Sequence, residues 1–244
     1  MNDLSWLSRT SLLIGEKALE HLTKQHVMVV GLGGVGSFAA EFIARSGIGT
    51  MTIIDGDVVD PTNRNRQLPA LSTNHGESKA EVMANRLKAI NPEITLNVVK
   101  SFITPDMVVE QLNRNPDYII DAIDSISPKV NFLCLAVEMK LPVVSSMGAG
   151  GKLDPTKLQV VDISKTYNCH FAQQVRKNLK THQIYKGIKV VFSPEEVDKN
   201  SLMMTDGNNY KKSAYGTMSY LPAVFGAVAA SVVIRDLIKL VKPD

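Results

Sequence analysis

Short apolar runs alternate along the chain with longer segments in which apolar residues recur every three or four positions. The apolar runs are HVMVVG from residue 26, TMTIID from 50, ITLNVV from 94, YIIDAI from 118 and LPVVSS from 141. Unbroken Val and Ile runs of this kind are typical of a parallel sheet covered by helices on both faces. The longer segments predict helices over 35–47, 77–90, 105–113 and 127–140. The pattern therefore predicts an α/β fold with a Rossmann-like, doubly wound, mainly parallel sheet.

Both ends of the chain add to this plan within a single predicted domain, 1–244. Residues 1–25 predict an N-terminal arm of short helices, which we expect against an edge of the sheet. After Gly151, KLQVVDIS and IKVVFS predict two extra strands around a polar helix at 168–181. Residues 194–216 are polar and rich in turn-forming residues, which predicts a mobile loop. Together, residues 163–216 form a predicted basic insert and mobile loop.

The last apolar segment, TMSYLPAVFGAVAASVVIRDLIKLV, is about long enough to span a membrane. Pro222 suits the first turn of a helix, and the small residues between 226 and 231 permit close packing. Arg235 and Asp236 interrupt the apolar run. We therefore expect a buried or subunit-contact helix, and no association with a membrane.

The composition is that of a globular protein, with 44% hydrophobic and 21% charged residues. Two cysteines are too few for a disulfide framework or a zinc site, so we expect no zinc and a reducing, cytoplasmic environment. The N-terminus shows no secretory signal pattern. Cys134 lies in an apolar helical segment and is expected in the core. Cys169, beside His170, could be an activated thiol, although a bystander role fits it as well.

The net charge of +3 is unevenly distributed. The segment from Ile163 to Pro194 contains no acidic residue. It carries six basic ones, which are Lys165, Arg176, Lys177, Lys180, Lys186 and Lys189. Such a block suits a polyanionic partner. A solvated helix face would have the same composition, so charge alone leaves both interpretations open.

A glycine-rich turn follows the first strand. Gly31, Gly33, Gly34 and Gly36 match G-x-G-x-x-G between a strand and a helix, a turn that cradles NAD, FAD or ATP. Asp55 ends the next strand, where an acid can accept hydrogen bonds from ribose hydroxyls. Asp57 is a second candidate for the nucleotide. The alternative for Asp55 is a carboxylate that caps the following turn, and the alternative for Asp57 is a structural role.

The stretch TNRNRQ, residues 62–67, favours ATP over a dinucleotide. It places Asn63, Arg64 and Arg66 beside the predicted ribose acid. A helix N-terminus largely satisfies a pyrophosphate, whereas a triphosphate carries further charge that guanidinium groups suit. Lys79, at the start of the next helix, adds another positive charge. We predict that the nucleotide is ATP.

A carboxylate for magnesium is predicted at the end of another strand. Asp124, in IIDAIDS, follows an apolar run, and a carboxylate there can hold Mg²⁺ against phosphate oxygens. The strand ends of a parallel sheet lie at one edge, so we expect Asp124 near Asp55 and the arginines. The predicted cofactors are ATP and Mg²⁺.

Taken together, GLGGVGS, ARSGIG, IIDGDVVDPTNRNRQ, SKAEVMANRLKAINP and DAIDS resemble the ThiF/MoeB/HesA superfamily of adenylating enzymes, from about Ser8 to the C-terminal end. The resemblance implies that Gly34 lies at the phosphates and Asp55 binds ribose. Asn63, Arg64 and Arg66 would line the ATP pocket. The implied catalytic residues are Arg66, Lys79 and Asp124, with Ser125 beside the Mg²⁺-linked acid.

The resemblance also implies a homodimer. Arg9 matches an arginine that family members extend into the ATP site of the partner subunit. A surface arginine on an N-terminal helix is the alternative.

The segments SSMGAGGKLDPTKLQVVDISKT and GTMSYLPAVFGAVAASVVIRDLI are similar to the branch of the superfamily that dehydrates threonylcarbamoyladenosine in tRNA anticodon loops. The resemblance implies adenylation of the threonyl carboxylate, after which an internal nitrogen displaces AMP and closes a ring. A tethered nucleophile reaches effective molarities of about 10⁵ M or more, so no enzyme thiol is required. On this view tRNA phosphates contact Arg176, Lys177, Lys180, Lys186 and Lys189. A sulfur-transfer protein is a further candidate partner.

Three alternatives remain. An adenylating activator of a ubiquitin-like sulfur-carrier protein would share the ATP site, but many such enzymes carry two C-x-x-C zinc pairs that this chain lacks. An NAD-dependent oxidoreductase needs a positioned acid or base, and none is evident around the histidines at 26, 75, 170 and 182. A non-catalytic scaffold would not need Arg66, Lys79 and Asp124.

Overall fold

The structure is a computed structural model, and it describes residues 4–197, 199–204 and 213–241. The strands are β1 (His26–Val30), β2 (Thr50–Ile54), β3 (Thr95–Val99), β4 (Tyr118–Asp121), β5 (Val143–Ser146), β6 (Gln159–Asp162), β7 (Lys189–Phe192), β8 (Leu202–Met204) and β9 (Ser213–Tyr215). The α-helices are α1 (Ser8–Ile14), α2 (Glu16–Leu22), α3 (Gly36–Arg45), α4 (Lys79–Ile90), α5 (Pro105–Leu112), α6 (Ile126–Glu138), α7 (His170–Thr181) and α8 (Tyr220–Ile238).

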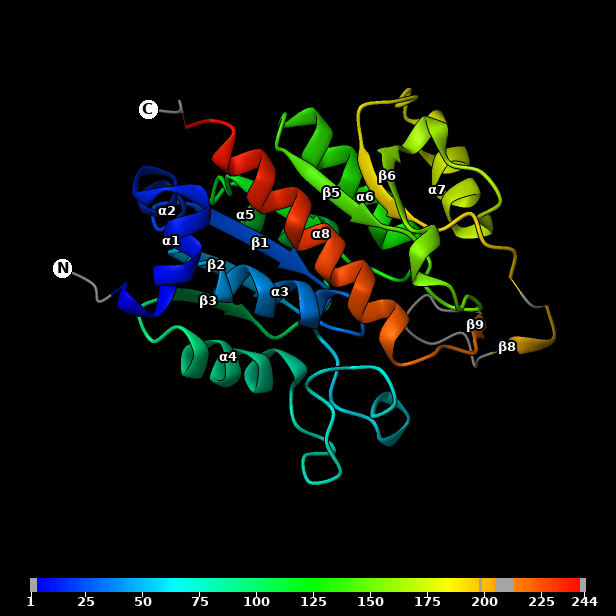
Figure 1. The fold of residues 1–244 in the computed structure, drawn as a ribbon. Helices are drawn as coiled ribbons and strands as arrows, with labels where there is room; N and C mark the ends of the chain where they lie inside the picture. The colour runs from blue at the N-terminus through cyan, green and yellow to red at the C-terminus, as the bar shows by residue number, and fades with distance from the viewer. Residues whose placement is uncertain (1–3, 198, 205–212, 242–244) are drawn as a thin grey trace.

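Seven strands form one sheet in the order β3-β2-β1-β4-β5-β7-β6, between two layers of helices (Figure 1). Neighbouring strands are parallel except β6, which is antiparallel to β7. The predicted fold class is confirmed, including the five apolar runs as strands and the two extra strands around a polar helix. Antiparallel β6 forms one edge of the sheet.

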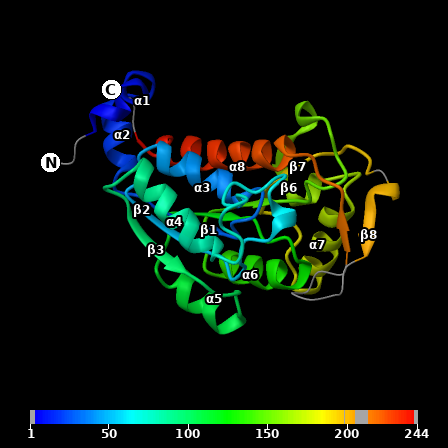
Figure 2. The same cartoon turned by 90° about the horizontal axis from the view of Figure 1, so that it is seen from below.

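Each face of the sheet has its own hydrophobic core. Val27 and Val29 of β1 face the core built with α3, α4 and α8, whereas Met28 and Val30 face the core built with α5, α6 and α7. Figure 2 shows these two helical layers on opposite sides of the strands. Because side chains alternate along a strand, an unbroken apolar run can serve two cores at once.

The direction of the sheet changes between β1 and β4. The chain moves outward from β1 through β2 to β3, then crosses to the other side of β1 for β4. The carboxyl ends of β1 and β4 therefore carry the crevice in which open α/β sheets bind ligands. Here the Ala122 N–H donates to the Val30 carbonyl at 2.9 Å.

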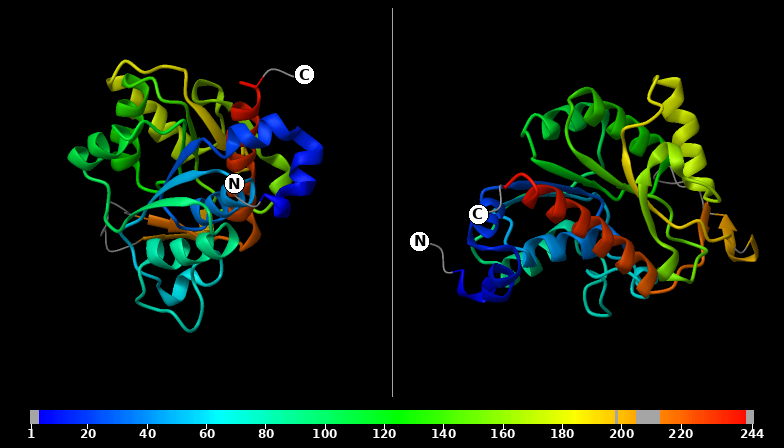
Figure 3. Two further views of the ribbon diagram at one scale, coloured as in Figure 1. Left: turned by 90° about the vertical axis from the view of Figure 1, so that its left-hand side faces the viewer. Right: turned by 45° about the horizontal axis from the view of Figure 1, so that its top comes forward.

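The N-terminal arm lies at the amino ends of the strands, with α2 beside α8 (Figures 1 and 3). Leu22 of α2 is fully buried in the core, and Leu7 packs against the turn at Gly47. In contrast, Leu12 and Leu13 of α1 are 88% and 85% exposed. The arm is therefore anchored on both sides of α1, and α1 itself presents an apolar surface.

Helix α8 packs its inner face against the sheet and α3. Leu221, Phe225 and Val233 are fully buried, and Pro222 lies in the first turn, as predicted. Among the residues that the structure describes, α8 is the one helix long and apolar enough to cross a membrane, and half of its apolar window is buried within the protein.

The segment 194–216, predicted as a mobile loop, contains two short strands that the sequence analysis did not predict. β8 and β9 pair as a small antiparallel sheet, and the Gly216 N–H donates to the Ser201 carbonyl at 2.9 Å. The three residues of β8 are all exposed, so no buried face marks this strand in the sequence. Residues 198 and 205–212, on which the mobile-loop prediction also falls, lie outside the described residues.

Candidate active site

The glycine turn at the end of β1 brings backbone into unusually close contact. A Cβ on Gly36 would lie 1.8 Å from the Gly31 carbonyl oxygen, and one on Gly34 would lie 2.9 Å from Pro222 Cβ. Gly31 adopts φ +87°, which glycine reaches without strain. In contrast, a Cβ on Gly33 would have no atom nearer than 3.7 Å. The turn opens α3, whose N-terminal amides and dipole make an anion site.

Asp55 lies beside this turn, directly after β2. Its Oδ2 accepts a hydrogen bond from the Leu32 N–H at 2.6 Å, and its Oδ1 accepts from the Asp57 N–H at 2.8 Å. Burial raises the pKa of the Asp55 carboxyl. Each carboxylate oxygen retains a lone pair, so the fixed group can still accept from ribose hydroxyls. The nucleotide contact itself stays a prediction.

Lys79 is the first residue of α4 and is held close to Asp55. Its Nζ lies 3.1 Å from Asp57 Oδ2, and its side chain is only 6% exposed. The ammonium also acts electrostatically on the Asp55 carboxyl. Asp57 is thus the counter-ion of Lys79. This structural role explains the position of Asp57 without a contact to the nucleotide.

Arg66 lies in the crossover segment that follows β2. Its Nη1 donates to the Thr62 carbonyl at 3.0 Å and to Asn65 Oδ1 at 2.9 Å. Burial lowers the pKa of Arg66, and the Asp124 carboxylate opposes that shift, so the two charged groups lie near each other. The structure therefore brings these two predicted residues together.

Asn63 is buried in the same segment and has a capping role. It ends the 3₁₀ turn Pro61–Asn63, and its Oδ1 accepts from the Asp60 N–H at 3.2 Å. This bond commits the side-chain oxygen to shaping the segment that carries Arg66.

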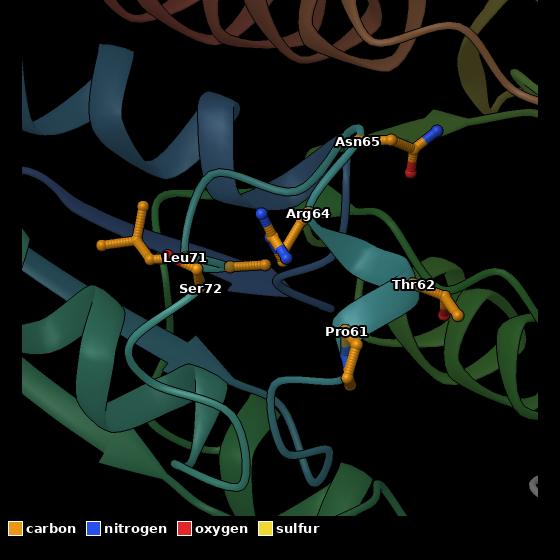
Figure 4. A pocket seen from close by; sticks show the side chains of 7 residues that line it. Pro61, Thr62, Arg64, Asn65, Leu71 and Ser72 are labelled. Carbon is orange, nitrogen blue, oxygen red and sulfur yellow. The ribbon is translucent and has the colours of Figure 1, made fainter.

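Arg64 faces another surface. It is exposed and lines an open hollow of about 610 Å³ with Pro61, Leu71 and Ser72 (Figure 4). In that view Arg64 points toward the loop that carries Leu71, whereas Thr62 points away from that loop. Asp55, Lys79 and the glycine turn do not line the hollow. The contact predicted between Arg64 and the nucleotide therefore stays a prediction.

Asp124 and Ser125 lie in the loop between β4 and α6. Asp124 is exposed, and Ser125 Oγ donates to its Oδ1 at 3.4 Å. Mg²⁺ prefers oxygen ligands and is commonly held by one or two carboxylates together with phosphate oxygens, so this donor set fits it. Among the described residues, no group of three His, Cys, Asp or Glu side chains could hold a metal alone. A magnesium here would share its ligands with the nucleotide.

Gln67 is a site residue that the sequence reasoning missed. It is the last residue of TNRNRQ, and its amide nitrogen lies nearest to the position of a Cβ on Gly33. Its Oε1 is buried and has no hydrogen-bond partner within the described structure. A buried acceptor of this kind calls for a ligand or water. In the sequence, only its position directly after Arg66 indicated a role for Gln67. Its proximity to Gly33 in the structure places it beside the glycine turn.

The five residues predicted to contact tRNA do not form one free basic face. The Arg176 guanidinium donates to the Thr166 carbonyl at 2.7 Å and also contacts the Thr166 hydroxyl. Lys189 forms an ion pair with Asp236. In contrast, Lys177, Lys180 and Lys186 are exposed. The charge pattern did not reveal these partners, because Thr166 is uncharged and Asp236 lies 47 residues away from Lys189.

Arg9 is exposed on α1, at the amino ends of the strands. The glycine turn and Asp124 lie at the carboxyl ends, so Arg9 is remote from the site of its own chain. A catalytic role for Arg9 therefore requires a second subunit.

Both cysteines pack in or against the core under α6 and α7, where Cys134 was expected. Cys169 is buried, 6% exposed, at the start of α7, whereas Cys134 is only half-buried on α6. Burial raises the pKa of the Cys134 thiol. The bystander interpretation of Cys169 fits its burial, since a nucleophile needs access to substrate.

Comparisons with known proteins give a consistent result. A model of the ThiF family matches residues 7–243. The chain is 40% identical to the tRNA threonylcarbamoyladenosine dehydratase of Escherichia coli K12, over 96% of this chain and 94% of that protein. It is also 40% identical to the protein of the same name from Bacillus subtilis 168, over 97% and 96%. The crystal structure of E. coli TcdA in complex with ATP matches with a TM-score of 0.88 at 40% identity, covering 98% of each chain.

Proposed function

Because the chain belongs to the ThiF family, we propose that residues 1–244 form a single adenylating domain that dehydrates threonylcarbamoyladenosine in tRNA at the expense of ATP. The observation that carries this proposal is the 40% identity to two dehydratases of that name over nearly the whole chain. The ATP complex of the E. coli relative supports the choice of nucleotide.

The proposed reaction has two steps. The threonyl carboxylate attacks the α-phosphorus of ATP, and pyrophosphate leaves. A nitrogen of the same modified nucleoside then attacks the acyl carbon, loses its proton and closes a ring while AMP leaves with the carboxylate oxygen. The balance is the loss of one water from the nucleoside and the conversion of ATP to AMP and pyrophosphate.

The residues at the carboxyl edge of the sheet can divide this work. The amides that open α3 face phosphate, and Asp55 accepts from ribose. Arg66 and Lys79 place positive charge where negative charge develops during attack on the α-phosphate. Asp124 would hold Mg²⁺, which supplies further charge neutralisation at the phosphates when bound. No thiol takes part, and the burial of Cys169 is compatible with that.

One assay tests the function. Purified protein receives ATP, Mg²⁺ and tRNA that carries threonylcarbamoyladenosine. We expect AMP to form together with a nucleoside lighter by one water. AMP released only with a ubiquitin-like sulfur-carrier protein would select that alternative, and no AMP with either substrate would refute an adenylating role.

We further propose that the protein is a homodimer in which Arg9 completes the partner's site. The exposed Leu12 and Leu13 lie one helical turn after Arg9 on α1 and supply apolar surface for a subunit contact. Mixing the impaired Arg9→Ala and Lys79→Met proteins should raise the activity above that of either variant alone, since mixed dimers regain one intact site. Mixtures that stay inactive, with subunit exchange shown separately, would place Arg9 outside catalysis.

For tRNA we propose a path along the exposed side of α7, over Lys177 and Lys180, and on to Lys186 in the segment between α7 and β7. Removing these three charges should lower the salt slope of tRNA binding by about two to three. Lys24 and Lys100, which are exposed but paired with Glu20 and Glu81, are matched controls. An unchanged slope in the triple variant would exclude this path.

The remaining predictions of partner and location extend this proposal. The buried inner face of α8 and the tRNA substrate favour a cytoplasmic protein without a membrane span. A sulfur-transfer protein remains a predicted partner, with no residue assigned to it.

A further inference from the structure

A fully buried ion pair lies beneath the loop that carries Asp124. Lys129 Nζ lies 2.6 Å from Asp121 Oδ2, and both side chains are 0% exposed. Ser145 Oγ donates to the same oxygen at 2.6 Å, and Lys129 Nζ donates to Ser145 Oγ at 3.2 Å. The cluster joins the end of β4, the first turns of α6 and the neighbouring strand β5. None of these three residues was singled out by the sequence analysis.

The second oxygen of Asp121 holds the loop. Asp121 Oδ1 accepts from the Ile123 N–H at 3.0 Å. Since Lys129 and Ser145 both occupy Oδ2, the carboxylate can rotate only by losing two contacts, and Oδ1 stays directed at Ile123. Asp124 is the next residue along the chain, so its backbone position depends on this bond.

The same short loop also contacts the glycine turn. The Ala122 N–H donates to Val30, and a Cβ on Gly31 would lie 2.8 Å from the Ala122 carbonyl oxygen. The loop therefore contacts the glycine turn of the proposed phosphate site on one side and the buried ion pair on the other. A shift of the pair would move Asp124 relative to the nucleotide.

Stability alone does not explain this cluster. A buried ion pair loses much of its Coulomb energy to desolvation, and apolar residues of similar size often replace one without loss. Lys129 is surrounded by protein on every side, with the Phe171 ring centroid 5.9 Å from its Nζ. What the cluster provides, and an apolar core would not, is a fixed acceptor for the Ile123 amide.

We propose that Asp121, Lys129 and Ser145 are positioning residues for adenylation, which act by fixing the loop that presents Asp124. The inference rests on the proposed function and adds to it a supporting layer without contact to substrate. We expect the cluster to affect kcat, the rate of the chemical step. The residues proposed to contact ribose and phosphate, Asp55 and Lys79, lie on other elements, at the end of β2 and the start of α4.

Two charge-free variants separate positioning from packing. Asp121→Asn with Lys129→Met keeps an oxygen for the Ile123 amide and a donor for Ser145. Asp121→Leu with Lys129→Met and Ser145→Ala fills the same space without any acceptor. Neither variant leaves a buried unpaired charge, so both are expected to fold, and their thermal unfolding is compared first.

We expect the Asn/Met variant to release AMP within threefold of the wild-type kcat, and the apolar variant to lose at least tenfold, on the scale of one lost charge-assisted bond. The Kd for ATP, measured without Mg²⁺ so that the Asp124 carboxylate has no metal to hold, should change less than threefold in both. In an Asp124→Ala background the apolar change should cause no additional loss, because the cluster acts through Asp124.

Equal kcat values for the two variants would overturn the proposal, as would a full additional loss in the Asp124→Ala background. If the apolar variant fails to fold, a kcat for the Asn/Met variant that falls more than tenfold with unchanged thermal stability would also overturn it. The wild-type assay with modified tRNA tests the proposed function separately. If the wild-type protein does not act on modified tRNA, the proposed function fails. The kcat values of the two variants can then still be compared with any carboxylate substrate that supports AMP release.

Discussion

Replacing Lys79 with methionine should separate nucleotide binding from folding. The change removes the ammonium and keeps an unbranched side chain of similar length at a site that is only 6% exposed. A charge-assisted bond to phosphate contributes about 1.5–3 kcal/mol, so kcat/KM for ATP should fall roughly 10- to 150-fold.

The same change should affect folding far less. The partner carboxylate of Asp57 is 43% exposed, and solvent screening limits such a pair to about 1 kcal/mol or less. For a chain of this size that corresponds to a decrease in Tm of roughly 2–4 °C. Steady-state AMP release and calorimetric titration with ATP, beside thermal unfolding, measure the two effects separately.

Asp57→Asn is the matched control, since it breaks the ion pair but leaves the ammonium of Lys79 in place. It should change ATP affinity at most about fivefold, the range of a screened pair. If Lys79→Met binds and uses ATP like the wild type, the lysine does not reach the phosphates. If Asp57→Asn loses as much as Lys79→Met at unchanged Tm, the carboxylate itself contacts the ligand.

Three further outcomes follow from the same geometry. Gly36→Ala pushes a methyl group into the Gly31 carbonyl and should cost more than about 3 kcal/mol, seen as a large drop in Tm, whereas Gly33→Ala should leave Tm unchanged yet weaken ATP binding. Burial raises the pKa of Asp55, and ribose hydroxyls donate to its carboxylate form. The affinity for ATP should therefore fall on acidification at a pH above the range in which aspartate usually titrates. Asp55→Asn, measured in parallel, should show an affinity that depends less on pH. Arg66→Lys loses the planar group that contacts Thr62 and Asn65 together and should lower kcat at least tenfold, a result that unchanged turnover would contradict.

The sequence was a good guide wherever the information is local. Apolar runs with flanking helices predicted the strands because a strand buried on both faces is built mainly from apolar residues. The glycine spacing predicted the turn at Gly31, since a positive φ and close backbone contact exclude other residues there. Asp55 and Lys79 lie at the end of a strand and the start of a helix, as the sequence predicted, whereas their contacts with a nucleotide stay predictions.

The sequence was a poor guide wherever partners come from distant parts of the chain. The sequence predicted that Arg176 and Lys189 are available to tRNA. In the fold, Arg176 donates to Thr166 and Lys189 forms an ion pair with Asp236. Arg64 and Arg66 are nearly adjacent, yet one lines an outer hollow and the other lies near Asp124.

By itself, the sequence determined the doubly wound sheet, the glycine turn and the family to which the chain belongs, because periodicity and short motifs are properties of neighbouring residues. Only the tertiary structure decided which charges are paired and which are available, and it alone revealed Lys129 buried against Asp121. The physical reason is that burial and ion pairing depend on the register between strands far apart in the chain, such as Asp121 opposite Ser145.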